Sequence, residues 1–255
     1  MLEKIFGWSS VITWSCVPYP QIFTNFKNKN SDGMSVCMIF LSILQFLCYT
    51  SLSYILFFSN NIEIKYEKIM KDDYTDIYLS DLFFATHALL STLILAFQYY
   101  FYEHSNNKLT ITSSITLLIL TMLVLMEITF CIILYYLHNN DIFLAYLILC
   151  FSISHNVFTF LKYVPQIYYT YKRKSIHDWN IANVNFDILG ALFLLSEMIV
   201  TAINKNEINS LFSNIAKFNL TIITILFDSI LYTQYYYFYP HNLKTLSNFR
   251  ENLIK

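Results

Sequence analysis

Seven stretches of mostly apolar residues follow one another along the chain, each about 20 residues or longer, the length that a helix needs to cross a bilayer. They lie at about 8–26, 35–58, 78–101, 110–137, 142–171, 180–203 and 216–239. The segments between them are short, apart from polar ones at about 59–77 and 204–215. The pattern predicts an all-α membrane protein with seven transmembrane helices in a single transmembrane domain over residues 1–255.

Composition supports lipid as the solvent, because 56% of the residues are hydrophobic and only 13% are charged. A soluble domain normally carries about twice this density of charge. The net charge is −1 and no basic stripe occurs, so nucleic acid is not an expected partner. The five cysteines lie in apolar stretches without metal-ligand spacing. No Ser-His-Asp, HExxH or P-loop pattern occurs, so we expect no enzyme activity, no metal and no cofactor other than protons as a coupling ion.

A sequence repeat divides the chain into two halves. The segment YPQIFTNFKNKNSDGMS from Tyr19 resembles VPQIYYTYKRKSIHDWN from Val164, at an offset of 145 residues. Two copies in the same orientation require an even number of crossings between them, and four helices satisfy this. We therefore expect parallel repeats at about 8–101 and 142–239, a linker helix at about 110–137 and a tail at about 240–255.

Each repeat carries a proline within its first helix, Pro20 or Pro165. A proline removes one backbone hydrogen bond and kinks a helix, so we expect hinges at both positions. The carbonyl group that each proline leaves free must find a partner inside the protein. The adjacent Gln21 or Gln166 is the natural candidate.

A doubled Pro-Gln in the first and fifth of seven helices resembles the PQ-loop family. Within that family the segments SDLFFATHALLSTLILAFQYYFYE, LKYVPQIYYTYKRKSIHDWNIANVNFDILGALFLLSEM and KFNLTIITILFDSILYTQ resemble the proton-coupled cystine exporters. The resemblance implies two parallel three-helix bundles joined by a linker helix, as in the SWEET sugar transporters. It also implies cystine and protons as partners, beside the lipid bilayer.

Ionisable residues inside a membrane are functional candidates by default, because burying a charge there is costly. Asp187 is the strongest, since Asn183 precedes it by four residues and shares its helix face. Lys162 precedes Gln166 by the same spacing, so the two faces could line one polar cavity. Burial favours a neutral carboxyl group and a nearby ammonium group favours a charged one, a balance that suits a proton carrier. The alternative is a static ion pair between Lys162 and Asp187.

The resemblance assigns further roles. It implies proton coupling at Asp187, Asp228 and Asp81, and it implies substrate contacts as follows: Lys162, Gln166, Asn183, Asp187 and, in the first repeat, Gln21. Asp81 has the alternative of a simple interfacial acid. We expect His87 to hydrogen-bond within the bundle. Glu127, Glu197 and His155 are left without a role.

The first repeat departs from the family. Cys37 replaces an expected acid, Ser42 an expected asparagine and Gln45 an expected glycine, so the substrate contacts of this half are open. Export of a cationic amino acid is an alternative, which the fixed charge of Lys162 disfavours. A PQ-loop receptor that transports nothing is another, and a sugar facilitator would need no intramembrane charges.

Lysine and arginine favour one membrane side. The run Lys172-Arg173-Lys174 against the end of the fifth span contributes most to this bias. We therefore expect the N-terminus in the lumen and the C-terminus in the cytosol. The resemblance implies a multi-pass protein in the membrane of an acidic organelle, a lysosome or a lysosome-like or digestive vacuole.

Overall fold

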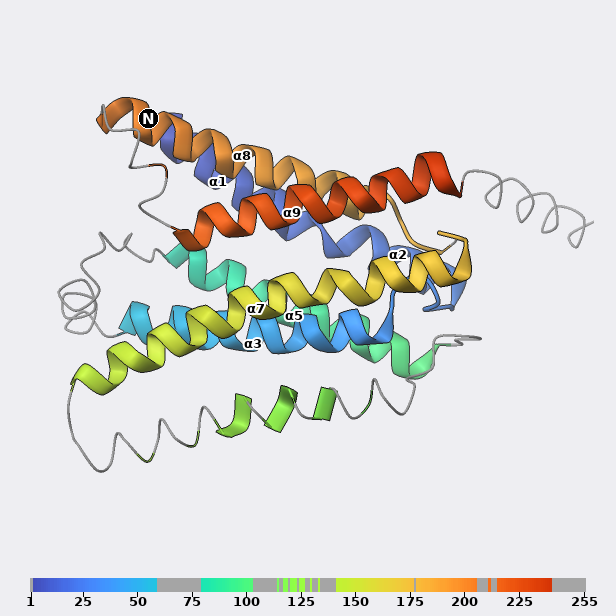
Figure 1. Ribbon diagram of the computed structural model, residues 1–255, viewed down its shortest axis with the longest axis horizontal. Helices are drawn as coiled ribbons and strands as arrows, with labels where there is room; N and C mark the ends of the chain where they lie inside the picture. Colours follow the sequence, from blue (N-terminus) through green and yellow to red (C-terminus); the bar gives the residue numbers. More distant parts are fainter. Residues whose placement is uncertain are drawn as a thin grey trace, which may run out of the picture.

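The computed structural model describes residues 2–58, 79–102, 141–176, 178–205, 211 and 215–239, with isolated residues between 114 and 133. Its elements are helices, and no strand occurs among these residues, which confirms the all-α fold (Figure 1). The longer elements are α1 (Leu2–Cys16), α2 (Pro18–Asn28), α3 (Val36–Phe58), α5 (Leu79–Phe101), α7 (Asp141–Arg173), α8 (Ala182–Lys205), α9 (Ile215–Thr233) and the π-helix η2 (Gln234–Phe238).

The first predicted span is broken, whereas its counterpart in the second repeat is continuous. α1 ends at Cys16 and α2 begins at Pro18, the first position of a helix, where a missing N–H costs nothing. α7 runs through Pro165 for 33 residues without interruption. The repeat equivalent of Pro18 is Tyr163, so the second repeat lacks this proline. The additional proline explains why the first span is broken and α7 is not. The observed break therefore lies at Pro18, two residues before Pro20.

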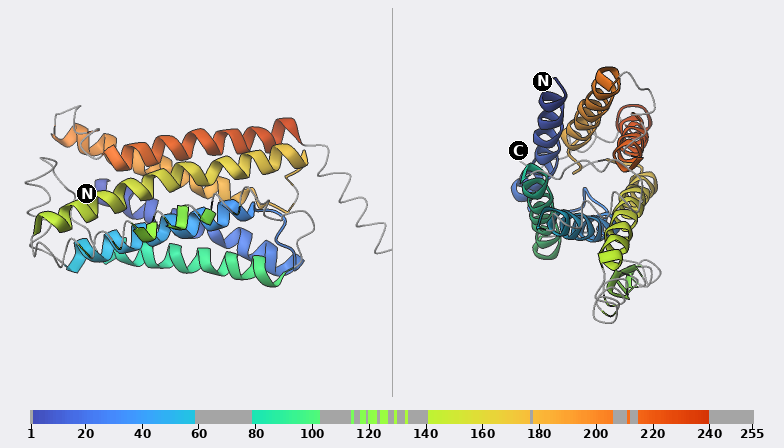
Figure 2. Two further views of the ribbon diagram at one scale, coloured as in Figure 1. Left: turned by 60° about the horizontal axis from the view of Figure 1, so that its bottom comes forward. Right: turned by 90° about the vertical axis from the view of Figure 1, so that its left-hand side faces the viewer.

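The helices of the two halves form a closed ring (Figure 2). In each half the third helix packs on the first two: α5 contacts α1, α2 and α3, and α9 contacts α7 and α8. The halves join where the first helix of one meets the second helix of the other, in the pairs α1 with α8 and α3 with α7. The order around the ring is therefore α1, α8, α9, α7, α3 and α5. This arrangement has the approximate twofold symmetry that the repeat predicts.

Large apolar side chains cover the outside of the ring. Phe83 is 69% exposed, Phe97 62% and Ile203 66%. A soluble protein rarely leaves so much apolar surface in contact with water. Within the described part of the chain, three helices are long and apolar enough to cross a membrane: α3, α5 from Asp81, and α8. The outer surface therefore faces lipid.

Most of the predicted linker helix at 110–137, including Glu127, lies outside the described residues, as do the segment 59–77 and the tail from 240. The isolated residues that are described place this stretch against the outside of the ring. Val124, Leu117 and Leu120 pack against a core cluster of α3 and α7 that includes Leu44 and Ile148. These three residues therefore lie on the seam between the halves.

Candidate functional site

The carboxyl group of Asp187 lies where α1, α7, α8 and α9 meet. The hydroxyl group of Tyr163 donates a hydrogen bond of 3.0 Å to its Oδ2. The indole Nε1 of Trp14 donates to the backbone carbonyl of the same residue at 3.2 Å. The ring of Tyr163 is stacked on Phe227 of α9, with 5.2 Å between the centroids and 2° between the planes. Asp187 is therefore held from α1 and α7, and α9 supports the ring of Tyr163.

Trp14 fits because α8 carries Gly190 at the contact. A Cβ atom at position 190 would lie 2.5 Å from Cδ1 of Trp14, which is closer than real contacts allow. Glycine here permits the close approach of α1 to α8. The contact fixes the position of α8 along its axis relative to α1. It thereby fixes the position of Asp187, which lies one turn before Gly190.

Lys162 and Asp228 complete the centre. Asp228 is 2% exposed, and its Oδ2 has no hydrogen-bond partner among the described residues. It lies close enough to Asp187 and Lys162 for all three charges to interact. The Nζ atom of Lys162 lies 4.9 Å from the ring centroid of Tyr163 and 5.8 Å from that of Phe46. Two acids and one base thus share the interior of the ring.

The alternative of a static ion pair does not match this geometry. Among the described residues, no nitrogen–oxygen distance of 4.0 Å or less joins Lys162 to Asp187 or Asp228. The ammonium group lies against aromatic rings, and both it and Asp187 remain half-buried. With two carboxylates and one ammonium group, the centre carries one surplus negative charge, which a proton or a ligand's ammonium group can neutralise.

The glutamines of the two Pro-Gln pairs form a reciprocal clasp at the end of the ring that carries the loops 29–35 and 174–181. Gln21 donates to the carbonyl of Asp178 at 2.9 Å and accepts from the backbone N–H of Asn180 at 2.9 Å. Its Nε2 also donates to Asn25. The first repeat therefore holds the loop of the second.

Gln166 makes the equivalent contacts in the opposite direction. It donates to the carbonyl of Gly33 at 3.2 Å and accepts from the backbone N–H of Ser35 at 2.6 Å. Gly33 and Ser35 lie 145 residues before Asp178 and Asn180, so the contacts of the two glutamines are related by the offset of the sequence repeat. Both glutamines are fully buried, at 0% exposure. Each half thus closes the loop of the other.

The clasp corrects the prediction that these amides satisfy the carbonyl groups freed by the prolines. That prediction is wrong: the amides are engaged by the opposite loop because the twofold arrangement brings that loop closer. Asn183 also lies toward the clasp, with its Nδ2 at 3.5 Å from Oε1 of Gln21. Gln21, Gln166 and Asn183 therefore gather at the loop end, while Lys162 and Asp187 lie nearer the middle of the ring. Substrate contact by the first three stays a prediction.

Other candidates lie apart from this centre. Asp81 is on the first turn of α5, half-buried, near the end opposite the clasp. His87 does hydrogen-bond within the bundle, since its Nε2 lies 2.7 Å from the hydroxyl group of Tyr19. Glu197 approaches Gly7, where a Cβ atom would lie 3.2 Å from its carboxylate. It therefore belongs to the contact between α1 and α8.

The first-repeat side of the ring presents a different surface. Ser42, the repeat equivalent of Asp187, is buried and donates to the carbonyl of Met38. Gln45 is buried, and its backbone carbonyl oxygen lies 3.4 Å from Nδ1 of His155. The ring of His155 is stacked on that of Tyr49, with 4.8 Å between the centroids. His155 stands seven residues before Lys162, so the two are on one face of α7, about 10 Å apart along the helix. Sequence reasoning left this histidine unassigned, and the structure places it between the halves.

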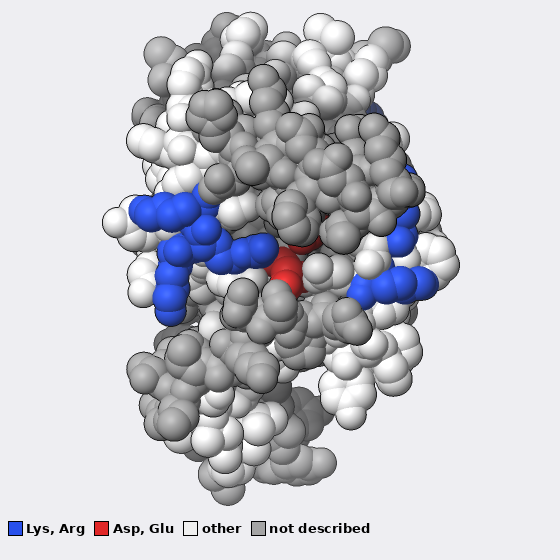
Figure 3. All heavy atoms as spheres, turned by 90° about the vertical axis from the view of Figure 1, so that its right-hand side faces the viewer, with Lys and Arg blue, Asp and Glu red and all other residues white. Residues whose placement is uncertain are grey.

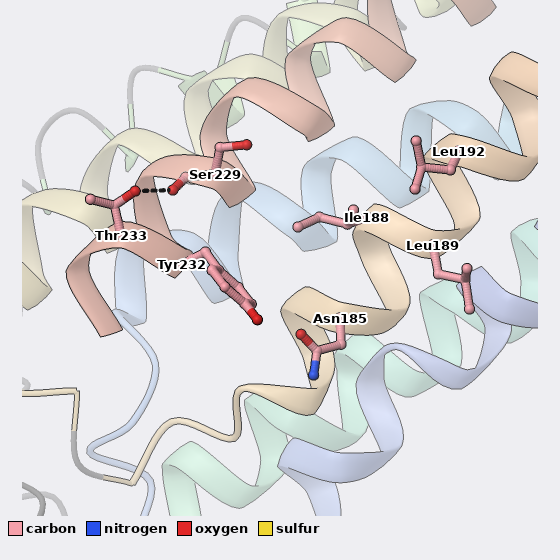
Figure 4. Close-up of a pocket in the computed structure, with 7 residues that line it drawn as sticks. All are labelled: Asn185, Ile188, Leu189, Leu192, Ser229, Tyr232 and Thr233. Carbon is pink, nitrogen blue, oxygen red and sulfur yellow. Dashed lines mark hydrogen bonds between the residues drawn. The ribbon is translucent and has the colours of Figure 1, made fainter. Parts of the chain in front are cut away.

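A hollow among the described residues lies apart from this centre. A groove of about 510 Å³ runs between α8 and α9 and is lined by Asn185, Ile188, Leu189, Leu192, Ser229, Tyr232 and Thr233 (Figure 4). Asn185 and Leu189 are exposed on the face of α8 opposite Asp187. The groove therefore opens toward lipid, and the ionisable centre is not part of it.

Tyr163 and Trp14 are the site residues that sequence reasoning missed. Both bond to Asp187, and neither is ionised at neutral pH, so a search for intramembrane charges passes over them. The available signal was that Tyr and Trp carry a polar group that needs a partner when buried.

A ring of lipid-facing helices around an ionisable centre defines a multi-pass membrane protein with the architecture of a transporter. Its two halves are PQ-loop units, because the PQ loop repeat family model matches residues 2–62 and 147–206. The chain therefore contains one PQ loop repeat match in each half.

Curated relatives narrow the likeness to cystinosins. The chain is 30% identical over 94% of its length to a cystinosin homolog of Caenorhabditis elegans, and 29% identical over 96% to cystinosin of Drosophila melanogaster. It spans 58% and 60% of the length of these two relatives. A cystine transporter of Saccharomyces cerevisiae is 22% identical over 92% of the chain and 93% of the relative.

Proposed function

We propose that this protein transports cystine together with a proton, from an acidic lumen to the cytosol. The observation that carries the proposal is the centre of Asp187, Asp228 and Lys162 inside a PQ-loop ring, in a chain whose relatives are named cystinosin and cystine transporter. Cystine has an ammonium group and a carboxylate at each end. Such a zwitterion asks for both an acid and a base, which the centre supplies.

Proton coupling follows from the charge of the centre. The two acids and Lys162 together carry one negative charge, and one proton makes the set neutral. Asp187 is the proposed carrier, because it is half-buried and so in reach of water, and because Tyr163 donates a hydrogen bond to its carboxylate. Asp228, which is almost fully buried, is the proposed second acid in proton coupling, because it lies close enough to Asp187 for their charges to interact. Asp81 is the proposed acid near the luminal entrance.

Orientation is supported by the basic residues at the clasp end. Lys27, Lys29, Lys172, Arg173 and Lys174 gather there, as two groups of blue side chains in Figure 3. The opposite end holds Lys4, Lys205 and Lys217 among the described residues. A basic excess is typical of cytosolic loops, so we propose that the clasp end is cytosolic and that α1 begins in the lumen. The proposed location is the membrane of a lysosome or a lysosome-like vacuole.

The test is uptake of labelled cystine into liposomes that contain the purified protein, with and without an acid outer buffer. We expect the gradient to stimulate uptake, and Asp187→Asn to lose that stimulation because an amide cannot carry the proton. Asn185→Gln is a matched control on the lipid-facing side of the same helix. Full gradient-driven uptake by Asp187→Asn would remove this residue as the carrier.

The identity of the substrate is tested in the same vesicles by counterflow. Counterflow of cystine supports the proposal. Counterflow of another zwitterion but not of cystine would replace the substrate and direct attention to Cys37, Ser42 and Gln45, where the first repeat differs from its family. No counterflow of any amino acid by folded protein would favour a receptor.

A further inference from the structure

Two lysines adopt a backbone conformation that lysine seldom takes. Lys29 follows α2 with φ 51°, and Lys174 follows α7 with φ 52°. They are repeat equivalents, 145 residues apart. A helix often ends in this left-handed conformation, but glycine or asparagine usually provides it, because a larger side chain crowds the backbone. Both repeats hold lysine where another residue would fit with less strain.

Both lysine side chains are folded over an aromatic ring three residues earlier. The Nζ atom of Lys29 lies 3.8 Å from the ring centroid of Phe26, and that of Lys174 lies 3.5 Å from the centroid of Tyr171. The two rings are also repeat equivalents, and they are 59% and 56% exposed. The left-handed backbone thus places each ammonium group over an exposed ring at the rim of the bundle. This motif, a lysine in the left-handed conformation with its ammonium group over an aromatic ring, therefore occurs once in each repeat.

More basic and aromatic side chains surround each copy. Lys27 is exposed beside the first, and Lys172 beside the second. Figure 3 shows the basic side chains as two groups on opposite sides of this end, with acidic atoms between them. Exposed Phe23 and Tyr168, again repeat equivalents, lie one turn further into the membrane-facing surface. Aromatic rings of this kind mark the level of the lipid headgroups.

We propose that each motif binds the phosphate group of an anionic phospholipid in the adjacent leaflet. The ring fixes the depth of the motif at the headgroup level, and two ammonium groups on each side face the layer where the phosphates lie. Anionic lipids are enriched in the cytosolic leaflet, which agrees with the proposed orientation of this end. The strained backbone is retained because only a long cationic side chain reaches a headgroup from this position.

The competing explanation is structural: each lysine would only cap a helix C-terminus and cover a ring. Substitution by glycine separates the two explanations, because glycine relieves the backbone strain while it removes the charge. A structural role predicts the same change of stability in every lipid. A headgroup site predicts a loss that appears only when anionic lipid is present.

The experiment measures the thermal unfolding midpoint of the full chain in neutral detergent, with added phosphatidylserine or with phosphatidylcholine of the same acyl chains. We expect phosphatidylserine to raise the midpoint of the native protein by about 2–4 °C relative to phosphatidylcholine, the stabilisation that a bound ligand gives a chain of this size. The double variant Lys29→Gly/Lys174→Gly should lose more than half of this difference. Lys4→Gln/Lys205→Gln removes the same charge at the opposite end and should keep it.

Several outcomes would overturn the proposal. One is equal midpoints of the native protein in the two lipids, and another is an undiminished difference in the glycine variant. Equal stabilisation by soluble glycerophosphoserine would show an anion site that does not need a lipid, and stabilisation by polyglutamate alone would show a protein partner. If the glycine variant does not fold, Lys29→Asn/Lys174→Asn tests the same point, since asparagine tolerates the left-handed backbone.

Discussion

The reciprocal clasp allows a sharp prediction from its geometry. Gln166→Met keeps the volume of the side chain but removes its bonds to the carbonyl of Gly33 and the N–H of Ser35. Both backbone groups belong to buried residues, so they would lose their partners without gaining water. An orphaned buried group costs about 1–3 kcal/mol, which gives about 2–6 kcal/mol for the pair. Gln21→Met should cost less, because its partners Asp178 and Asn180 are only half-buried and can regain bonds to water.

The assay is thermal unfolding of the purified protein in detergent. A loss of that size lowers the midpoint by roughly 5–20 °C for a chain of this length. Gln98→Met is a matched control, because Gln98 is also buried but bonds to Ile22 and Asn25 within its own half. The control should lose stability without releasing one half from the other.

The double variant of Gln21 and Gln166 tests whether the two arms open together. If they form one cooperative unit, the second substitution adds less than about 0.5 kcal/mol to the first, since the loops are already released. Independent arms would give additive losses. A midpoint of Gln166→Met within 1 °C of the native value would refute the reasoning, because it would mean that the loop groups find other partners.

Three further predictions concern the centre. Tyr163→Phe should keep the stacking on Phe227 but weaken gradient-driven uptake several-fold, because it removes the hydrogen-bond donor to Asp187. A pH profile of uptake identical to the native one would contradict this. Gly190→Ala should lower stability by about 1–3 kcal/mol through overpacking against the α1 tryptophan, which thermal unfolding measures. His155→Ala should raise the KM for cystine at least threefold if its ring contacts substrate, whereas an unchanged KM would assign it to the contact between α3 and α7.

The helices could be predicted because span length and hydropathy dominate a membrane chain. The expected 35–58 and 78–101 correspond to Val36–Phe58 and Leu79–Phe101. The start of the first span was harder to predict. α1 begins at Leu2, several residues before the apolar run, because Glu3 and Lys4 are tolerated at a helix end outside the hydrocarbon core. The break at Pro18 also escaped, since two prolines in one helix could be accommodated as a kink or as a stop.

The site could be predicted only in part. That Asp187 and Lys162 lie close enough for their charges to interact could be expected from the cost of isolated charges in lipid. Their partners Tyr163 and Trp14 depend on how α7 and α1 are rotated in the ring, which no local spacing fixes. The clasp was hidden for another reason. The offset of the two Pro-Gln pairs was visible, but a contact from each half to the loop of the other requires the twofold arrangement in space.

Symmetry separates the scaffold of this protein from its chemistry. The clasp glutamines, the left-handed lysines and the helix contacts all occur twice, related by the same offset. The ionisable centre occurs only once among these features, because the equivalents of Tyr163 and Asp187 in the first repeat are Pro18 and Ser42. The twofold axis relates the two halves and not the two ends of the ring, so both arms of the clasp close the same end. The chemistry proposed for this protein therefore lies in the second half of the chain, which supplies Lys162, Asp187 and Asp228.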